Sequence, residues 1–400
     1  MICLDALDPA LPDPILGLTE AFKADTRAGK VNLSVGVYQN EHAQTPAFRA
    51  VQQAERLLLE DGRARGYLPI TGSPRFVAAT QALVFGAALG HLGERLVSLQ
   101  APGGTGALRV AADFLYQRLE VRRAWVSTPT WANHPGVFAA AGLETAAYPY
   151  FDAATNTIAF DALCDALRTG PARGEVIILH ACCHNPTGAD LTATQWAEVA
   201  SVCAERELLP LLDFAYQGLG DGLAEDAAAI QVFAQAGLPF FVASSYSKNF
   251  GLYQDRTGLL SFVAPTPQIA QAVASQLKSI VRTNYSNPPA HGGLVVAAIL
   301  DDAERRAAWE VELTEMRERI LSMRHALVDG LQAAGAGRDF GFLAAQRGMF
   351  SFTGLTQEHV RRLREDHAIY LVGSGRINVA GLNPGNIDRV CSAVAAVLKT

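Results

Sequence analysis

The chain has no apolar run close to the roughly 20 residues that a membrane-spanning helix needs. It also has no excess of positive charge: the formal net charge is -6 at pH 7, which gives no general attraction for nucleic acid or anionic membranes. The first residues include Asp5 and Asp8, where a secretory signal would carry a basic segment and then an apolar one. The sequence therefore predicts partners that are neither nucleic acid nor membrane.

Cysteine is scarce and unpaired, with six residues scattered along the chain and no CxxC motif. A chain of this size and type is not expected to depend on disulfides, which is in keeping with a cytoplasmic location. The segment 180–184 places Cys182 and Cys183 between two histidines and could suggest a metal site. It is too compressed for four side chains to converge on one ion without a sharp bend, so we predict no metal.

Internal repeats, low-complexity segments and long polar linkers are also absent, and half of the residues are apolar. A chain of 400 residues can bury a large core and is expected to form two domains. Strand-like apolar runs alternate with amphipathic segments such as 107–119 and 194–206. This pattern predicts an α/β fold with a mainly parallel sheet covered by helices on both faces. The runs lie at residues 96–99, 124–127, 176–180, 208–212, 240–243 and 259–263. Apolar side chains recur every three or four positions over residues 309–331, which predicts one long helix.

Parallel sheets bind ligands outside the carboxyl ends of their strands, and three polar residues follow strand-like runs: Asn185, Asp213 and Lys248. Lys248 has Ser245 and Ser247 before it, and Arg256 follows eight residues later. An amine beside hydroxyls and a guanidinium suits the capture of a phosphorylated aldehyde, because the lysine can form a Schiff base while the other groups donate to the phosphate. A surface lysine among turn-forming serines is the alternative interpretation.

Two further features suit a phosphorylated ring. The glycine turn 102–106 contains Gly104 and Thr105 and precedes a helical segment, whose first amides and dipole favour an anion. It lacks the lysine of a P-loop and the third glycine of a dinucleotide-binding loop, and an ordinary turn is an equally good interpretation. Asp213 could pair with a protonated pyridine nitrogen, or it could cap a helix.

The run 244–251, taken together with Arg256, closely resembles the lysine motif of the class I aminotransferases, which depend on pyridoxal 5'-phosphate. Within this passage Gln254 and Thr257 depart from the usual residues of the motif. The glycine turn, the segment 184–188 and the environment of Asp213 resemble further motifs of the family, in the family's order. The resemblance implies the fold type I of pyridoxal-phosphate-dependent transferases, with a seven-stranded sheet in a large domain and a smaller discontinuous α/β domain. It implies an enzyme in which Lys248 is the catalytic base, assisted by Asp213 and Tyr216.

The same resemblance implies the contacts of the cofactor and of the substrate. The cofactor would be held by Gly104, Thr105, Trp131, Asn185, Asp213, Tyr216, Ser245, Ser247, Lys248, Arg256 and Tyr67. The substrate would be held by Gly36, Trp131, Asn185, Arg282 and Arg376. Arg376 would bind the α-carboxylate, to which a guanidinium can donate twice. His134 and His180 would help to keep Asp213 ionised.

The resemblance also implies a homodimer with shared active sites. Tyr67 would reach the phosphate in the neighbouring subunit, and Arg282 would bind the side-chain carboxylate of a substrate there. We expect an extended N-terminal arm at residues 1–14 that lies on the partner. A small domain would consist of residues 15–45 and 316–400, and a large domain of residues 46–315.

The predicted substrates are aspartate and 2-oxoglutarate. Arg282 favours a dicarboxylate, but aromatic-preferring relatives can move this arginine aside, so an aromatic-amino-acid aminotransferase of broad specificity is the alternative. Four positions resemble aspartate-specific bacterial members, and Gln39 and Gly66 match neither branch. The four are Val37, Thr45, Thr105 and Asn287. A decarboxylase or lyase with the same cofactor, and a binding protein that retains the fold, are more distant alternatives.

Overall fold

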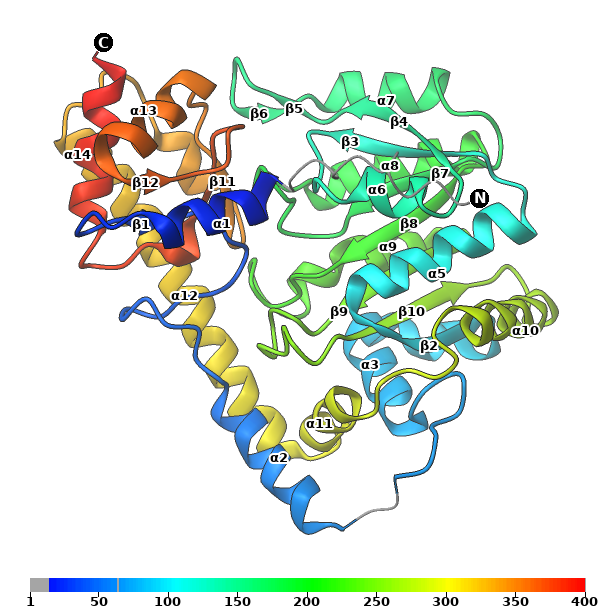
Figure 1. Cartoon of the computed structure of the whole chain (residues 1–400). Coiled ribbons are helices and arrows are strands. Elements are labelled where there is room, and N and C mark those ends of the chain that lie inside the picture. The colour runs from blue at the N-terminus through cyan, green and yellow to red at the C-terminus, as the bar shows by residue number, and fades with distance from the viewer. Residues whose placement is uncertain (1–13, 63–64, 400) are drawn as a thin grey trace, which may run out of the picture.

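The computed structural model describes residues 14–62 and 65–399. Figure 1 shows a larger body around one sheet and a smaller body that contains both ends of the described chain, with the long helix α12 running between them. The predicted arm lies outside the described residues apart from Pro14, which begins helix α1.

The helices longer than one turn alternate with the strands along most of the chain. They are α1 (Pro14–Ala24), α2 (Arg49–Glu60), α3 (Pro74–Phe85), α4 (Leu89–Leu92), α5 (Gly103–Arg118), α6 (His134–Ala139), α7 (Phe160–Thr169), α8 (Ala193–Glu205), α9 (Ala228–Gln235), α10 (Pro267–Asn284), α11 (His291–Leu300), α12 (Ala303–Ala333), α13 (Gln357–His367) and α14 (Ile387–Leu398). The strands are β1 (Val31–Asn32), β2 (Leu96–Pro102), β3 (Arg123–Thr128), β4 (Glu144–Pro149), β5 (Phe151–Asp152), β6 (Thr157–Ile158), β7 (Val176–His180), β8 (Leu209–Phe214), β9 (Phe240–Ser245), β10 (Thr257–Val263), β11 (Phe350–Phe352), β12 (Ile369–Tyr370) and β13 (Arg376–Asn378).

The central sheet has seven strands in the order β2-β10-β9-β8-β7-β3-β4. Every neighbouring pair is parallel except those of β10, which runs antiparallel to β2 and β9. The prediction of a mainly parallel sheet is therefore confirmed. Strand β4 was not among the predicted runs: it is an edge strand that exposes most of its side chains, so it lacks a continuous apolar pattern.

The strands of this sheet contribute to two cores, one on each face. Leu211 packs with helices α5 and α10 on one face, and Leu212 packs with the α8 and α9 side on the other. Strands β7 and β9 are buried at every position, which explains why both appear as continuous apolar runs in the sequence. The register pairs His180 with Asp213 and Phe214 with Ser244, so the carboxyl ends of β7, β8 and β9 meet at one edge.

Two helices differ in detail from the sequence expectation. Helix α5 begins at Gly103 rather than at residue 107, so the glycine turn is its first turn. Gly103 has φ +74°, a left-handed conformation that glycine adopts most easily at this junction of strand and helix. In α12 the predicted apolar stripe is buried, but Arg324 is buried with it. Its guanidinium donates to Ser351 Oγ and to the carbonyl of Gly348.

The smaller body joins segments from opposite ends of the chain. Strand β1 pairs in parallel with β12, and β11 pairs antiparallel with β13. The Asn378 side chain donates to the carbonyls of Val35 and Val37, at 2.7 and 2.8 Å. The N-terminal segment is thus fixed next to β13, although more than three hundred residues separate them in the sequence.

One described stretch, Pro74–Arg95, has the length and hydropathy of a membrane span. It consists of α3 and α4 with short 3-10 turns between and after them, beginning at Gly86 and Gly93. Phe76 and Phe85 of α3 are fully buried, and Phe76 packs edge-on against the ring of Tyr246. Its apolar composition is explained by packing in the core.

Candidate active site

A cavity of about 220 Å³ lies at the edge of the sheet where β7, β8 and β9 end. Its size suits one small molecule rather than a polymer. Residues far apart in the sequence line it: Gly36, Gly104, Thr105, Leu108, Trp131, Asn185, Asp213, Ala215, Tyr216, Ser245, Ser247, Lys248, Tyr253 and Arg256. Most of the residues that the sequence singled out therefore share one pocket.

Lys248 enters the pocket from the loop that connects β9 to β10. Its Nζ lies 4.7 Å from the centre of the Tyr216 ring. Burial lowers the pKa of Lys248 to about 8; Asp213 opposes this shift, and Arg256 adds to it. A much larger fraction of the amine is therefore neutral near pH 7 than for an ordinary lysine, and a neutral amine is the form that attacks a carbonyl or accepts a proton.

An anion cradle lies beside Lys248, formed by the first turn of α5, Ser245, Ser247 and Arg256. Arg256 Nη1 donates to Ser247 Oγ at 3.2 Å, and the hydroxyls of Ser245 and Ser247 are 3.2 Å apart. A Cβ on Gly103 would lie 2.5 Å from Arg256 Nη2, and one on Gly104 would lie 3.1 Å from Ser245 Cβ. A side chain at Gly103 would therefore displace the Arg256 guanidinium, and one at Gly104 would crowd Ser245. A guanidinium, hydroxyls and helix amides gathered in this way fit a phosphate group.

Asp213 is a buried carboxylate that remains ionised. Burial alone would raise its pKa, but the hydrogen bond from His134 and the electrostatic interactions with His134, His180 and Lys248 hold the pKa below its ordinary value. His134 Nε2 lies 3.1 Å from Asp213 Oδ2, and its Nδ1 lies 2.8 Å from Thr130 Oγ1. An ionised carboxylate at this position fits a protonated ring nitrogen.

The network continues from Thr130 to a second histidine. Thr130 Oγ1 is 3.1 Å from His180 Nε2. Burial, with a contribution from His134, lowers the pKa of His180 to about 3, so this ring stays neutral. Of the two histidine side chains, that of His134 is hydrogen-bonded to the Asp213 carboxylate, and that of His180 is connected to it through Thr130 and His134.

Asn185 joins the two polar sides of the pocket. Its Nδ2 donates to Tyr216 Oη at 3.5 Å, and its Oδ1 accepts from Arg376 Nη1 at 3.4 Å. Burial raises the pKa of Tyr216 far above its usual range, so its phenol keeps its proton and can donate.

Arg376 is buried with one donor unused. Its Nη2 donates to the carbonyl of Ser34 at 2.5 Å, and the guanidinium lies 4.4 Å from the centre of the Phe350 ring. Its Nε has no hydrogen-bond partner in the described part of the chain. A buried guanidinium with a free donor fits a carboxylate.

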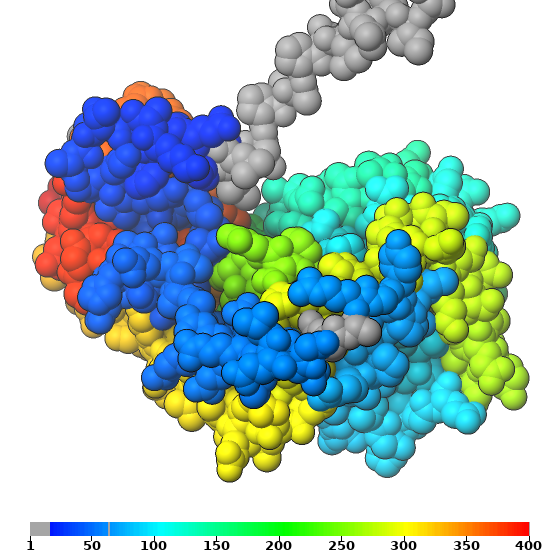
Figure 2. Space-filling model, turned by 60° about the horizontal axis from the view of Figure 1, so that its bottom comes forward, coloured from blue at the N-terminus to red at the C-terminus, as the bar shows by residue number. Residues whose placement is uncertain are grey.

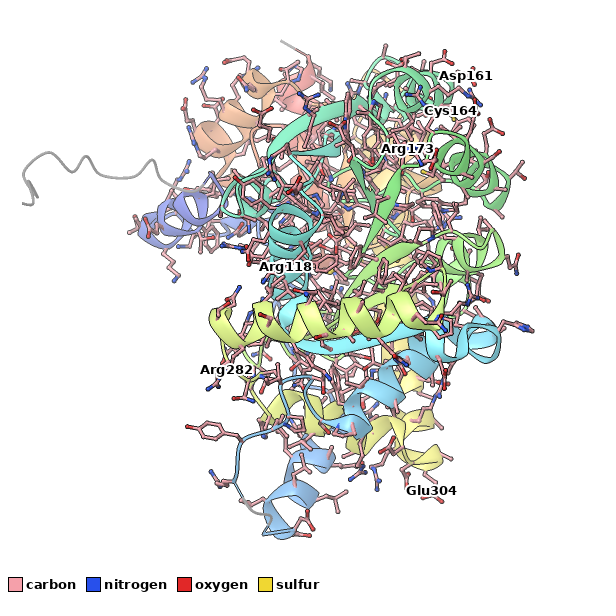
Figure 3. The ribbon with its side chains drawn as sticks, turned by 90° about the vertical axis from the view of Figure 1, so that its right-hand side faces the viewer. Arg118, Asp161, Cys164, Arg173, Arg282 and Glu304 are labelled. Carbon is pink, nitrogen blue, oxygen red and sulfur yellow. The ribbon has the colours of Figure 1, made fainter. Side chains whose placement is uncertain are left out.

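Arg376 does not line the pocket itself but is linked to it through Asn185. Two further predicted residues, Tyr67 and Arg282, do not line this pocket either. They border a separate hollow on the surface, and Tyr67 is 96% exposed. Arg282 stands near the end of α10 and points outward (Figure 3). Asn287 Nδ2 donates to the carbonyl of Leu68 at 2.6 Å, which fixes the two segments side by side. In Figure 2 the blue segment between α2 and α3 and the yellow-green segment between α10 and α11 lie next to each other on one face.

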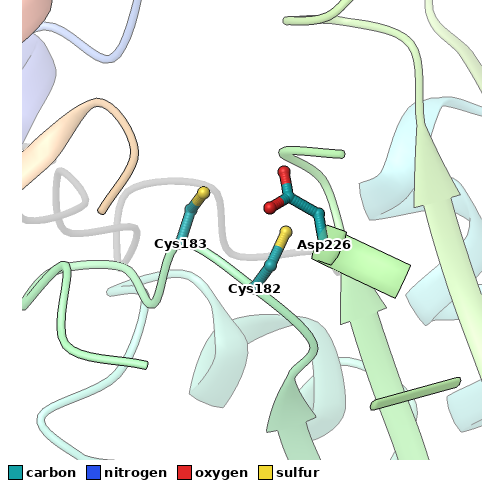
Figure 4. Close-up of side chains that lie close together, drawn as sticks. All are labelled: Cys182, Cys183 and Asp226. Carbon is teal, nitrogen blue, oxygen red and sulfur yellow. The ribbon is translucent and has the colours of Figure 1, made fainter. Parts of the chain in front are cut away.

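The cysteine and histidine segment does not provide a metal-binding geometry. His184 stacks on Tyr150 at 3.9 Å, and its Nε2 lies 3.0 Å from Ser127 Oγ. Cys182, Cys183 and Asp226 do lie together (Figure 4), with one ligand atom of each within 4.8 Å of the others.

The ligand atoms of this cluster are already committed. The Asp226 carboxylate accepts the N–H groups of Gly218, Gly220 and Asp221. Burial raises the pKa of Cys182 far above its usual range. The hydrogen bond that Cys183 accepts from Cys182 lowers the pKa of Cys183, but burial and nearby carboxylates together outweigh it and raise that pKa to about 12. Protonated thiols and an engaged carboxylate are poor ligands for a cation.

Three residues that line the pocket were not predicted: Leu108, Ala215 and Tyr253. Tyr253 Oη accepts the N–H of Tyr38 at 3.0 Å, which ties the Lys248 loop to the N-terminal segment. A tyrosine two positions after Gly251, at the end of the lysine motif, was the available signal. Leu108 and Ala215 carry no polar group, so nothing in the sequence distinguished them from core residues.

The family model described as aminotransferase class I and II matches residues 28–394. The aspartate aminotransferase of Escherichia coli K12 is 51% identical over 387 residues, which cover 96% of this chain and 98% of that protein. The aromatic-amino-acid aminotransferase of the same organism is 49% identical over 394 residues, covering 98% and 99% of the two chains. The aromatic-amino-acid aminotransferase of Burkholderia pseudomallei, solved with covalently bound pyridoxal phosphate, has a TM-score of 0.96 and 52% identity, and the match covers 100% of both chains.

Proposed function

The chain belongs to the class I and II aminotransferases and is a pyridoxal-phosphate-dependent transaminase, and on this premise we propose that it transfers the amino group of L-aspartate to 2-oxoglutarate. The products are oxaloacetate and L-glutamate. One observation carries this proposal: buried Arg376, with its free Nε, is linked through Asn185 to the pocket that holds Lys248 and Asp213. A carboxylate bound there brings the amino group of an α-amino acid into the reach of Lys248.

In this proposal each residue has a separate task. Bound pyridoxal phosphate supplies a ring that accepts electrons. Lys248 anchors the cofactor and, once displaced by the substrate amine, carries the proton away from the substrate Cα. Asp213 holds the ring nitrogen protonated, and Asn185 and Tyr216 donate to the ring oxygen. The glycine turn with Thr105, Ser245, Ser247 and Arg256 binds the phosphate, while Trp131 and Gly36 border the ring and substrate.

The same proposal includes a homodimer. Tyr67 and Arg282 are exposed on one face, together with Leu59 of α2, which is 78% exposed. An aromatic ring, a guanidinium and a leucine exposed together suit a surface that a second copy covers. We infer that Tyr67 donates to the phosphate in the partner's pocket and that Arg282 binds the distal carboxylate there.

The domain division belongs to the proposal as well, with residues 15–45 and 316–400 as the small domain and 46–315 as the large one. The pairing of β1 with β12 supports grouping the two ends of the chain.

A cytoplasmic location is also proposed, and it is supported by free thiols at all five described cysteines, as expected in a reducing compartment.

An aromatic-amino-acid aminotransferase is the second candidate. It is supported by the 52% identity to the Burkholderia enzyme and by Gly66, which removes bulk beside Tyr67. Arg282 favours the dicarboxylate, because a guanidinium left without a partner disfavours an uncharged ring.

The test is a comparison of kcat/KM for aspartate, tyrosine and phenylalanine with 2-oxoglutarate, together with product identification. We expect aspartate to exceed both aromatic substrates by at least about ten-fold, a difference of roughly 1.4 kcal/mol. Equal or higher constants for tyrosine would overturn the assignment to aspartate in favour of the second candidate. Release of carbon dioxide without a keto acid would overturn transamination itself. Lys248→Ala is the control: it should still bind the cofactor and lose nearly all turnover.

A further inference from the structure

We propose that Asp190 is a positioning residue, which holds the loop that carries Asn185 and thereby aims the Asn185 amide into the pocket. The proposal rests on the proposed function, because it concerns the same site. The loop follows β7 and returns towards α8. Asp190 Oδ2 accepts the N–H of Cys183 at 2.6 Å, and Oδ1 accepts the N–H of His184 at 2.8 Å.

A carboxylate is suited to this place by the local backbone. Cys183 has φ +50°, a left-handed conformation that is uncommon for a residue with a side chain. The N–H groups of Cys183 and His184 point to the same carboxylate, and each of its oxygens accepts one of them. With an amide in place of the carboxylate, an NH₂ group would face one of these two N–H groups, and that backbone N–H would lose its acceptor.

Two further contacts hold the far side of the loop. Tyr150 Oη donates to the carbonyl of Ala189 at 2.7 Å, and the N–H of Arg347 donates to the carbonyl of Gly188 at 2.6 Å. These bonds fix the return of the loop towards α8.

The backbone of the turn immediately before Asn185 is held by Asp190 and by the weak bond from the Asn185 N–H to His180 Nδ1, at 3.5 Å. The His184 ring is held separately, by stacking on Tyr150 and by the hydroxyls of Ser127 and Thr187. Asp190 is thus the group that fixes the two backbone N–H groups immediately before Asn185.

The position of Asn185 affects both ends of the site. Its amide lies between Tyr216 and Arg376. A shift of the turn would therefore move the N–H group that donates to the ring oxygen and would also weaken the hydrogen bond that Asn185 Oδ1 accepts from Arg376. Two charged groups influence Asp190 itself: Arg347 favours its ionised form, and Asp226 disfavours it. Burial raises the pKa of Asp190 to about 6, the bonds from His184 and Cys183 oppose that shift, and the carboxylate is largely ionised at neutral pH.

The test uses Asp190→Asn, with Asp152→Asn as a matched control. Asp152 also accepts a backbone N–H in a turn, that of Ala154 at 2.8 Å, but it lies in the β5–β6 hairpin and does not line the pocket. Three quantities are measured: the pH midpoint of the absorbance of cofactor bound at Lys248, KM and kcat for the amino acid, and the melting temperature.

We expect Asp190→Asn to raise the absorbance midpoint by at least about 0.3 pH unit, because a misdirected amide no longer stabilises negative charge on the ring oxygen. KM should rise at least about ten-fold. Asp152→Asn should leave both unchanged. In the double variant with Asn185→Ala, the further substitution of Asp190 should change KM less than about two-fold, since it acts through Asn185.

A lower melting temperature with an unchanged midpoint and KM would show a merely structural role and overturn the proposal. Additive effects in the double variant would do the same. If Asp190→Asn does not fold, Asp190→Glu takes its place, because it keeps the charge and displaces it by one methylene. This variant should also raise the absorbance midpoint. An unchanged midpoint in Asp190→Glu would overturn the proposal. The absorbance measurement needs no turnover, so it remains decisive even if the protein does not transaminate aspartate.

Discussion

At the scale of single residues, burial decides the chemistry of the site. Lys248 is an amine whose pKa falls to about 8 mainly because it is removed from water, and Asp213 opposes that shift. Asp213 itself stays ionised because the hydrogen bond from His134, together with the electrostatic contributions of His134, His180 and Lys248, outweighs its burial. Burial favours the neutral form of both groups, which makes the lysine reactive but would also protonate the carboxylate. The hydrogen bond from His134 helps to keep Asp213 ionised while Lys248 can lose its proton.

The pH dependence of cofactor capture should follow from this. When apoenzyme is mixed with pyridoxal phosphate, the rate of adduct formation should rise with pH and level off above about pH 8, because only the neutral amine of Lys248 attacks. Asp213→Asn removes a group that raises the pKa, so its midpoint should move to lower pH. Stopped-flow absorbance from about pH 6 to about pH 10 measures both. A rate that continues to rise to about pH 10 in the unmodified protein would show an ordinary, solvated lysine.

At the scale of elements, α12 connects the catalytic loops to the smaller body. Trp309 Nε1 donates to the carbonyl of Asn249, next to Lys248, at 2.7 Å, and its ring stacks on Phe250 at 4.4 Å. One turn further on, Leu313 packs closely on Gly218: a Cβ added to Gly218 would lie 2.4 Å from Leu313 Cδ2. Arg319 Nη2 donates to the carbonyl of Leu382 at 2.6 Å. One rigid helix thus fixes two loops of the pocket and the segment that follows β13.

Trp309→Phe should therefore destabilise the protein although it keeps an aromatic ring. The carbonyl of Asn249 loses its donor inside the core, and the free energy of unfolding should fall by about 1–3 kcal/mol. Urea unfolding of the apoenzyme measures this. Val311→Ala is the control on the same helix: Val311 is 56% exposed, and its loss should change the free energy by less than about 0.5 kcal/mol. Equal changes in the two variants would contradict the importance of the tryptophan hydrogen bond.

At the scale of the whole molecule, the two arginines proposed for the substrate occupy different places. Arg376 is buried and linked to the Lys248 pocket through Asn185, whereas Arg282 lies on an outer face beside exposed Tyr67. A single chain thus has the proposed α-carboxylate site near the lysine but keeps the guanidinium proposed for the distal carboxylate outside that pocket. In the proposed homodimer each pocket receives Arg282 from the other chain.

Mixed dimers test this arrangement. Lys248→Ala and Arg282→Ala should each lose most activity towards aspartate, and Arg282→Ala should retain more towards phenylalanine. After dissociation and reassociation of an equal mixture, half of the dimers should be mixed, and each should have one intact site, giving about a quarter of the wild-type activity. The control mixes Lys248→Ala with Arg376→Ala, which should regain nothing, because Arg376 serves the pocket of its own chain. Recovery in the control, or none in the first mixture, would show that Arg282 does not act across the interface.

The sequence by itself determined the features that depend on local pattern. Continuous apolar runs predicted β7 and β9, because strands buried on both faces need no alternation, and the spacing of apolar residues predicted α12. The lysine motif and the glycine turn were readable because each requires particular residues within one short segment. The edge strand β4 and the apolar pocket residues Leu108 and Ala215 carried no such pattern.

Only the tertiary structure decided which of these groups meet. The residues that line the pocket are spread along the sequence from Gly36 to Arg256. Several of them meet because the parallel strands bring their carboxyl ends to one edge of the sheet. The hydrogen bonds that Asp190 accepts from the turn before Asn185 depend on how the loop folds back on itself. The position of Arg282 on an outer face depends on which surfaces the fold leaves exposed to solvent. Burial and distance set pKa values and hydrogen bonds, and both are properties of the folded chain rather than of the order of its residues.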